Sequence, residues 1–289
     1  MGEIIGAGIV AHAPTIMMSE QDRYELNEGK EISLVPGLRR LRSEVLDALK
    51  PDTIVIFDTH WFTIVEFVVS AHARRSGLYT SDELPRGMKQ IPYDLKGNPQ
   101  LATEMAAAAT RHGIRTTPID DPWLPIHYPT VNLSTFLDRG EEWIGVSHAY
   151  SADPEDFLKV GAGIGEAIRA SDKRVVLIAS GSMSHRFWPL RLIPAHEASD
   201  PIHISTPEAR EADLERIAWF QEGNHAAVID SMPQYLRHAP EARFGHYLMM
   251  AAALGGREWT AKGRLFSDYE NATGTSQVHV WFDRPEGGW

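Results

Sequence analysis

The sequence predicts an α/β protein with a central, mostly parallel or mixed sheet and helices on both faces. Four continuous apolar runs rich in β-branched residues, at 4–11, 53–59, 143–147 and 175–180, are typical of strands buried on both faces. Segments with apolar residues at helical spacing lie between these runs, and such alternation indicates an α/β fold. No linker-like, repetitive or low-complexity segment divides the chain, so we expect a single domain over residues 1–289.

The expected helices follow from the spacing of their apolar residues and from the residues at their ends. Residues 36–49 carry leucine and valine at helical spacing and stop before Pro51. Residues 99–112 are rich in alanine and are followed by Gly113, a residue type that commonly ends helices. Further helices are expected at 154–170, 207–221 and 224–232, and a buried helix at 244–254.

Two shorter strands complete the expected pattern. Residues 114–119 form an apolar segment that leads into a proline-rich loop at 120–129. Residues 277–282 alternate in polarity, which is typical of a strand at the edge of a sheet.

Composition and charge exclude several classes of protein. The formal net charge of -11 disfavours nucleic acid as a partner, because phosphate binding needs a basic surface. The absence of cysteine excludes disulfides and thiolate metal sites, and it fits a reducing compartment. The amino terminus lacks the pattern of a signal peptide, and no apolar run approaches the ~20 residues that cross a bilayer. We therefore expect a cytoplasmic protein that binds neither nucleic acid nor a membrane.

Histidines follow each of the four strand-like runs. His12 and His60 come directly after the first two, His148 follows the third, and His185 lies shortly after the fourth. Because the carboxyl ends of parallel strands line the ligand crevice of such sheets, these imidazoles are expected at one edge. Two neutral imidazoles and one carboxylate hold non-haem Fe(II) and leave open positions, but the same donors also suit zinc in hydrolases. The ligand types alone therefore leave the metal open.

Two other motifs are weaker. Residues 6–11 match the dinucleotide pattern G-x-G-x-x-A, yet the glycines lie inside the apolar run and Pro14 follows, so no helix opens there. Residues 179–187 look like a strand-to-loop elbow with serines, but they lack the second glycine of a nucleophile elbow.

Several segments resemble the type III extradiol ring-cleavage dioxygenases, the superfamily of protocatechuate 4,5-dioxygenase. The similarity is greatest to the single-subunit members that cleave 3,4-dihydroxyphenylacetate. The matching segments span most of the chain in order, and they are Asp58-Thr59-His60-Trp61, Tyr79–Pro85, Gly97-Asn98-Pro99, Ala179–Phe187 and Gly274–Val278.

The resemblance implies roles for five residues. His12 and His60 match the two imidazole ligands of the iron, and Glu241, just ahead of the expected buried helix, matches the carboxylate ligand. Asp268 and Glu270 are competing acids nearer the carboxyl terminus. His185 matches a second-sphere acid–base histidine, and His127 in the proline-rich loop matches another active-site histidine, expected to hold bound oxygen or a substrate hydroxyl.

The resemblance also implies an activity, which is Fe(II)-dependent extradiol cleavage of a catecholic acid such as 3,4-dihydroxyphenylacetate, with O₂ as co-substrate. Fe(II) is expected rather than Mn(II), and the protein is expected to form a homo-oligomer. Protocatechuate, a gallate derivative or a biaryl catechol remain alternative substrates, and Arg186, Arg191 and Arg243 are candidates to bind a substrate carboxylate. Two hypotheses from other functional classes stay open: the protein could be a zinc-dependent hydrolase or a non-enzymatic binding protein on the same fold.

Overall fold

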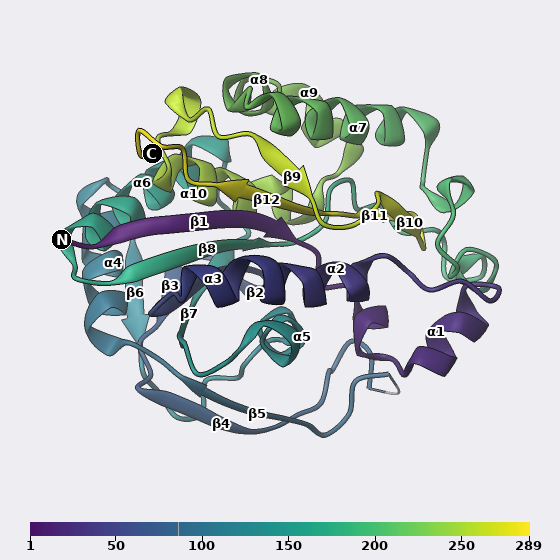
Figure 1. The fold of residues 1–289 in the computed structure, drawn as a ribbon, viewed down its shortest axis with the longest axis horizontal. Coiled ribbons are helices and arrows are strands. Elements are labelled where there is room, and N and C mark those ends of the chain that lie inside the picture. Colours follow the sequence, from purple (N-terminus) through teal and green to yellow (C-terminus); the bar gives the residue numbers. More distant parts are fainter. Residues whose placement is uncertain (86) are drawn as a thin grey trace.

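In the part of the chain that the structure describes, ten strands form one mixed sheet whose middle is parallel (Figure 1). The protein is described here by a computed structural model, which covers residues 1–85 and 87–289. Four neighbouring strands run parallel, in the spatial order β7 (Glu142–Ala149), β2 (Thr53–Thr63), β8 (Arg174–Ser180) and β1 (Glu3–Val10). These strands are the four apolar runs, so the expected α/β sheet is confirmed.

Antiparallel strands extend the sheet beyond β1. Strand β12 (His279–Asp283) pairs with β1 and with β9 (Gly263–Leu265), so β9 is the last strand on this side. The expectation of an edge strand at 277–282 is therefore wrong. Residues 275–282 are all buried, and the polar members of the segment, such as His279, are satisfied by internal hydrogen bonds rather than by solvent.

Shorter strands complete the other side and a small second sheet. Their bounds are β3 (Phe67–Ser70), β4 (Arg74–Tyr79), β5 (Ile91–Lys96) and β6 (Thr116–Ile119), with β10 (Glu270–Ala272) and β11 (Thr275–Gln277) forming a separate pair. β4 and β5 form an antiparallel hairpin that joins β7, while β3 pairs with both β6 and β7.

Helices cover both faces of the sheet, as predicted (Figure 1). One face is covered by α4 (Pro99–Arg111), α6 (Pro154–Ala170) and α10 (Gly245–Ala253). The other is covered by α5 (Tyr128–Leu137) and by α2 (Leu34–Arg40), which continues through a π-helical segment (Leu41–Leu46) into α3 (Asp47–Leu49). The remaining helices are α1 (Glu20–Leu26), α7 (Pro207–Glu222), α8 (His225–Asp230) and α9 (Met232–Tyr235). Short 3₁₀ turns lie at Pro14–Met17, Ile193–Ala195, Pro201–His203, Leu236–His238, Glu241–Phe244 and Gly256–Glu258.

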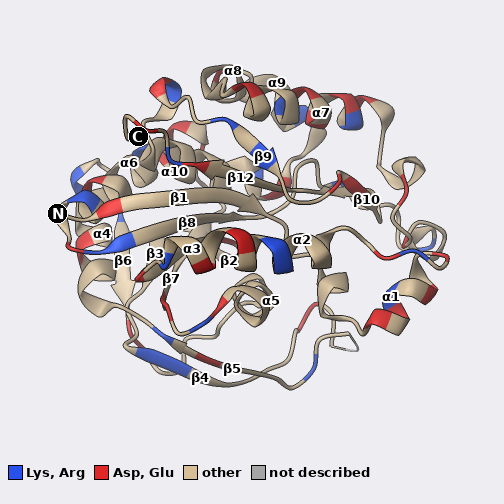
Figure 2. Ribbon diagram, viewed as in Figure 1, with Lys and Arg blue, Asp and Glu red and all other residues tan. Residues whose placement is uncertain are grey.

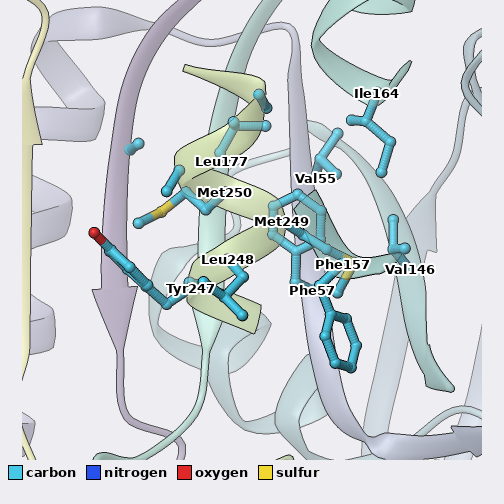
Figure 3. Close-up of a cluster of buried hydrophobic side chains, with 14 of the residues drawn as sticks. Val55, Phe57, Val146, Phe157, Ile164, Leu177, Tyr247, Leu248, Met249 and Met250 are labelled. Atoms are coloured by element: carbon cyan, nitrogen blue, oxygen red, sulfur yellow. The ribbon is translucent and has the colours of Figure 1, made fainter. Parts of the chain in front are cut away.

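Alternate residues of one strand serve two separate cores. Val55 and Phe57 of β2 pack with α4, α6 and α10, whereas Ile54 and Ile56 pack with the helices of the opposite face. In Figure 3, side chains of α10, including Leu248 and Met249, lie against the strand residues of the first core. Fully burying one such side chain contributes about 1.5–3 kcal/mol relative to leaving it exposed. This double burial explains why the strands are continuously apolar in sequence.

Charged residues are concentrated on the outer elements. Figure 2 shows them on the surface helices, the loops and the β4–β5 hairpin, while the middle of the central strands carries almost none. Within residues 1–85 and 87–289, every helix is too short or too polar to traverse a bilayer.

Candidate metal centre

Two histidines and one glutamate from distant parts of the chain meet at the carboxyl ends of the parallel strands. His12 lies just beyond β1, His60 lies near the end of β2, and Glu241 opens the short turn before α10. The Nε2 atoms of His12 and His60 lie 3.4 and 3.3 Å from Oε1 of Glu241. Across the described residues, this is the one group of three or more metal-ligating side chains whose donor atoms all lie within 4.8 Å of one another.

A local irregularity of β2 turns His60 toward the site. The register between β2 and β7 shifts between Phe57 and Phe62, and the carboxylate of Asp58 accepts the backbone N–H groups of His60 and Trp61. Thr130 donates a hydrogen bond of 2.7 Å to the other oxygen of Asp58. The strand therefore continues past Asp58 with His60 fixed in place.

The second ring nitrogen of each imidazole already has a partner. Nδ1 of His60 lies 2.9 Å from Oε1 of Glu83, and Nδ1 of His12 lies 2.8 Å from Oγ of Ser180. A carboxylate accepts a hydrogen bond, so Glu83 favours a proton on Nδ1 of His60 and leaves Nε2 as the nitrogen that would bind a metal. Metal-binding histidines are commonly oriented by such contacts.

Glu241 is held by donors from two neighbouring segments. The backbone N–H of Ser182 donates to Oε2 at 2.5 Å, and the Thr59 hydroxyl donates to Oε1. Burial opposes ionisation of Glu241, but the facing imidazoles of His12 and His185 outweigh it and hold the pKa of the carboxyl well below its usual range. Burial also opposes a charge on His60, yet hydrogen bonds to Glu241 and Glu83 raise the pKa of His60 to about 10. The centre therefore favours positive charge, and its donor set fits a divalent cation.

The turn that presents Glu241 is left-handed. Ala242, Arg243 and Phe244 have φ angles of 47°, 55° and 61°, a region that residues other than glycine rarely adopt. Such strain persists where surrounding contacts over-determine the backbone, and it is concentrated at functional sites. Here the hydrogen bond from the Glu241 N–H to the Met183 carbonyl, at 3.0 Å, anchors the start of the turn.

His185 lies next to the three clustered residues. Its backbone N–H donates to the Ala239 carbonyl at 3.0 Å, and its Nδ1 lies 3.8 Å from Oε2 of Glu241. This Nδ1 is buried and has no hydrogen-bond partner among the described residues. Burial lowers the pKa of His185, which leaves its ring neutral and able to accept a proton.

The proline-rich loop brings an unexpected residue to the site. His127 precedes α5, and its ring stacks on Trp61 at a centroid distance of 5.9 Å with a buried Nε2 that has no partner within the described chain. The hydroxyl of the next residue, Tyr128, lies 2.6 Å from Nε2 of His60. Tyr128 was missed in the sequence analysis, although its position beside His127 was an available signal.

The competing acids lie elsewhere. The Glu270 carboxylate accepts hydrogen bonds from Ser33 and Ser199, and Asp268 is exposed. Neither belongs to the cluster that contains Glu241.

Exposed aromatic rings border the centre. The Phe62 ring lies 6.3 Å from that of His60, and the Phe187 ring lies 4.8 Å from that of His185. Phe62 and Phe187 are 58 and 59 % exposed, which is unusual for phenylalanine and leaves two apolar walls open to a ligand.

Comparison with known proteins gives a consistent result. The family model described as the catalytic LigB subunit of aromatic ring-opening dioxygenase matches residues 6–282. The 3,4-dihydroxyphenylacetate 2,3-dioxygenase of Escherichia coli is 27% identical over 91% of this chain and 94% of its own length. The 2-aminophenol 1,6-dioxygenase beta subunit of a Pseudomonas species is 25% identical over 88% of this chain and 86% of its own length.

A solved structure shares the fold. The crystal structure of an uncharacterized protein from Escherichia coli K12 matches with a TM-score of 0.64 and 18% identity, covering 96% of this chain and 99% of the other. At this identity the likeness concerns the fold alone.

The match to a family of aromatic ring-opening dioxygenases spans nearly the whole sequence, and the names of both relatives are those of dioxygenases. These findings do not favour the alternatives of a zinc hydrolase or a non-enzymatic binding protein. The chain belongs to the family of the catalytic LigB subunit of aromatic ring-opening dioxygenases, and it is a ring-cleavage dioxygenase.

Proposed function

We propose that this enzyme catalyses Fe(II)-dependent extradiol cleavage of a catecholic aromatic acid such as 3,4-dihydroxyphenylacetate. Both atoms of O₂ enter the product, a ring-opened semialdehyde. The observation that carries the proposal is the convergence of His12, His60 and Glu241 beside His185. The relative named as a 3,4-dihydroxyphenylacetate 2,3-dioxygenase supports the substrate class.

His12, His60 and Glu241 are the proposed ligands of the iron. Their Nε2 atoms, which both face Glu241, and the ionised carboxylate supply a two-histidine, one-carboxylate set, which leaves neighbouring positions for other ligands. When bound, ferrous iron supplies those positions and the electron transfer from the aromatic ring to O₂ that the reaction needs. Ser180 and Glu83 keep the two imidazoles oriented.

His185 is the proposed acid–base group. Its buried Nδ1 has no hydrogen-bond partner among the residues that the structure describes, so it is available to a catechol hydroxyl. It takes a proton from that hydroxyl on binding and returns it when the ring opens. Tyr128 is a second polar group in reach, since burial raises the pKa of its phenol and keeps the O–H as a donor. The role expected for His127 stays a prediction.

The proposed substrate ring lies between the exposed side chains of Phe62 and Phe187. Each ring already packs against a histidine of the centre. An aromatic substrate there buries apolar surface and gains offset or edge contacts worth about 0.5–1.5 kcal/mol per ring pair.

The test is anaerobic loading of the purified protein with Fe(II), followed by O₂ and a panel of ring substrates. The panel contains 3,4-dihydroxyphenylacetate, protocatechuate, gallate, a biaryl catechol and 2-aminophenol, and parallel samples receive Mn(II) or Zn(II). We expect one O₂ consumed per 3,4-dihydroxyphenylacetate and a yellow ring-opened product with Fe(II). Oxygen uptake with another panel member alone would correct the substrate. No uptake with any of them would overturn the proposal.

We further propose a cytoplasmic homo-oligomer. The named beta subunit and a related alpha subunit, from a 2-aminophenol 1,6-dioxygenase, are both similar to this chain, which supports assembly of such folds. Light scattering of the purified protein tests the oligomeric state.

A further inference from the structure

A fully buried carboxylate lies on α7, outside the metal centre. Asp213 is 0 % exposed and accepts hydrogen bonds from four hydroxyl groups and a backbone N–H. Oγ of Ser184 and Oγ of Ser276 both lie 2.6 Å from its Oδ2. The hydroxyls of Tyr269 and Tyr235 lie 2.6 and 2.7 Å from its two oxygens, and the Ser184 N–H donates at 3.1 Å.

No lysine or arginine of the described chain forms an ion pair with Asp213. Arg216, from the same helix, instead lies 4.0 Å above the Tyr235 ring, and Arg210 lies 5.9 Å above that of Tyr269. Burial raises the pKa of Asp213, and the hydrogen bonds from Ser184, Ser276 and the tyrosines oppose that rise. Placing a carboxylate in the interior costs several kcal/mol. An apolar residue would fill the position without that cost, so a carboxylate here is explained by the groups that its hydrogen bonds hold in place.

Two of those donors, Ser184 and Ser276, come from segments next to His185. Ser184 is the residue before His185, and the Ser184 carbonyl accepts the N–H of Ser276 at 3.0 Å. The N–H of Met183 in turn donates to the Ser276 carbonyl at 3.2 Å. On the other side, Ser184 and Pro240 form an antiparallel bridge next to Glu241. The loop that carries His185 is therefore held between two segments, and Asp213 bonds both its backbone and a flanking strand.

The contact with Ser184 restrains orientation. Asp213 binds both the N–H and the hydroxyl of Ser184, so neither the peptide plane nor the side chain of this residue can rotate without losing a bond. The next peptide, which joins Ser184 to His185 and sets the direction of the His185 Cα–Cβ bond, is held by Ser276. The N–H and hydroxyl of Ser276 lie 3.0 and 3.1 Å from the Ser184 carbonyl, and the same hydroxyl contacts Asp213. Within the described chain, Nδ1 of the His185 ring has no hydrogen bond that would fix the ring.

We propose that Asp213 is a positioning residue for His185, acting through Ser184 and Ser276 to aim the imidazole at the bound catechol. This inference rests on the proposed acid–base role of His185. It assigns no contact with substrate or metal to Asp213.

The test is a double-mutant cycle between Asp213→Asn and His185→Ala, with enzyme loaded with Fe(II) and 3,4-dihydroxyphenylacetate as substrate. Asparagine has the same shape as aspartate, but its NH₂ group would face hydroxyl donors, so the contacts with Ser184 weaken. We expect kcat of the single variant to fall about 10- to 100-fold, as for misplacement of a reacting group. Bound iron and KM stay within about twofold. In the His185→Ala background the same change should lower kcat by less than about twofold, because the two residues act as one unit.

Glu142→Gln is the matched control. Glu142 is also a carboxylate that accepts several hydrogen bonds, from Thr53, Asn98 and Lys173, but it starts β7 at the opposite end of that strand from His148. This variant can lose stability, and its kcat should remain at the wild-type value.

The outcomes separate the two proposals. If Asp213→Asn lowers kcat equally in both backgrounds, or leaves kcat unchanged in the wild type, the positioning role is wrong while that of His185 stands. If His185→Ala alone keeps wild-type kcat, the acid–base proposal fails and the role of Asp213 fails with it. Should Asp213→Asn not fold, Tyr269→Phe and Ser276→Ala each remove one donor, and the same non-additivity with His185→Ala is expected at a smaller scale.

Discussion

At the scale of single residues, the polar side chains of the centre differ in how firmly hydrogen bonds hold them. Both proposed histidine ligands have one ring nitrogen committed to a neighbour and the other directed at Glu241. Glu241 is itself held at both oxygens. By contrast, Nδ1 of His185 has no hydrogen-bond partner among the described residues. The Tyr128 hydroxyl contacts Nε2 of His60, the atom proposed to bind iron, so a metal there would leave this hydroxyl for a substrate. The fixed set suits a metal, and the free set suits proton transfer.

Tyr128→Phe tests which residue of the proline-rich loop acts at the centre. The Tyr128 hydroxyl lies 2.6 Å from Nε2 of His60, whereas the ring of His127 packs on Trp61. We expect the variant to retain iron and to lose about tenfold in kcat, the value of one charge-assisted hydrogen bond. His127→Asn serves as the comparison in the same oxygen-uptake assay. A larger loss for His127→Asn than for Tyr128→Phe would restore the role expected for the histidine.

Arg243→Gln tests recognition of the substrate carboxylate. Arg243 is exposed and lies two residues after Glu241. The pKa of the buried His148 is lowered to about 4, mainly by burial and in part by the positive charge of Arg243. The His148 ring lies 5.8 Å from that of Phe62, which borders the centre, and this neighbourhood makes Arg243 a candidate to bind the carboxylate. Loss of a charged hydrogen bond of about 1.5–3 kcal/mol should raise KM for 3,4-dihydroxyphenylacetate about 10- to 100-fold.

The control substrate for this prediction is 4-methylcatechol, which has no carboxylate, and its KM should not change. The control variant is Arg186→Gln, since the Arg186 guanidinium already donates to the Arg237 carbonyl at 3.1 Å. An equal rise in KM for both catechols would remove Arg243 from carboxylate recognition.

At the scale of elements, helices and strands with a regular apolar pattern could be predicted from the sequence. Segments whose conformation depends on contacts with distant parts of the chain could not. Helix α6 was expected at 154–170 and lies at Pro154–Ala170, because its spacing and its capping residues are local signals. Helix α5 was not expected, since Pro129 and the surrounding prolines indicate a loop, yet proline is tolerated in the first turn. None of the three left-handed residues after Glu241 is a glycine, so the sequence gives no signal for this turn. Its conformation depends on contacts with the loop at 181–185, which are remote in sequence.

The proposed metal ligands were predicted for a different reason. His12 and His60 follow apolar runs, and the topology of parallel sheets brings such ends together. Glu241 has no comparable local signal and was identified from the family resemblance alone. Glu83, Tyr128 and Asp213 were missed because their roles depend on hydrogen bonds across the fold.

Gly161→Ala tests the close contact between α6 and α10. A Cβ at this position would lie 2.1 Å from the Met249 carbonyl oxygen. This oxygen belongs to the backbone of α10, so it cannot move aside as the end of a flexible side chain can. We expect a loss of about 1–3 kcal/mol in the free energy of unfolding, measured by urea denaturation. Gly287→Ala, where the added carbon meets nothing within 4 Å, should change stability by less than about 0.5 kcal/mol. Unchanged stability of Gly161→Ala would mean that the two helices can separate at little cost.

At the scale of the whole molecule, the protein also buries neutral histidines that do not belong to the proposed metal centre. His225 accepts from the Tyr247 hydroxyl and donates to the Ala261 carbonyl, while it stacks on Trp259 at 3.5 Å. His279 accepts the Ala11 N–H and donates to the Leu34 carbonyl. In each ring one nitrogen accepts and the other donates, so these networks fit the neutral form and have no place for a second proton.

This arrangement makes global stability depend on pH in a defined direction. Burial lowers the pKa values of His225 and His279 to about 4, whereas an unfolded histidine has a pKa of about 6.5. Between these values the unfolded chain binds more protons than the folded one. Stability is therefore complete above about pH 6.5 and falls as the pH drops toward 4, by up to about 3 kcal/mol for each histidine.

Urea denaturation at pH 7.5 and pH 5 measures this dependence. His225→Gln, which removes one titrating ring, should lower stability at pH 7.5 and reduce the difference between the two pH values by about 1–2 kcal/mol. His112→Gln, at an exposed histidine that contacts Glu166, should leave that difference unchanged. A His225→Gln variant as sensitive to acid as the wild type would show that the buried ring is protonated without cost. The acid sensitivity would then have to come from other groups, such as the buried His279.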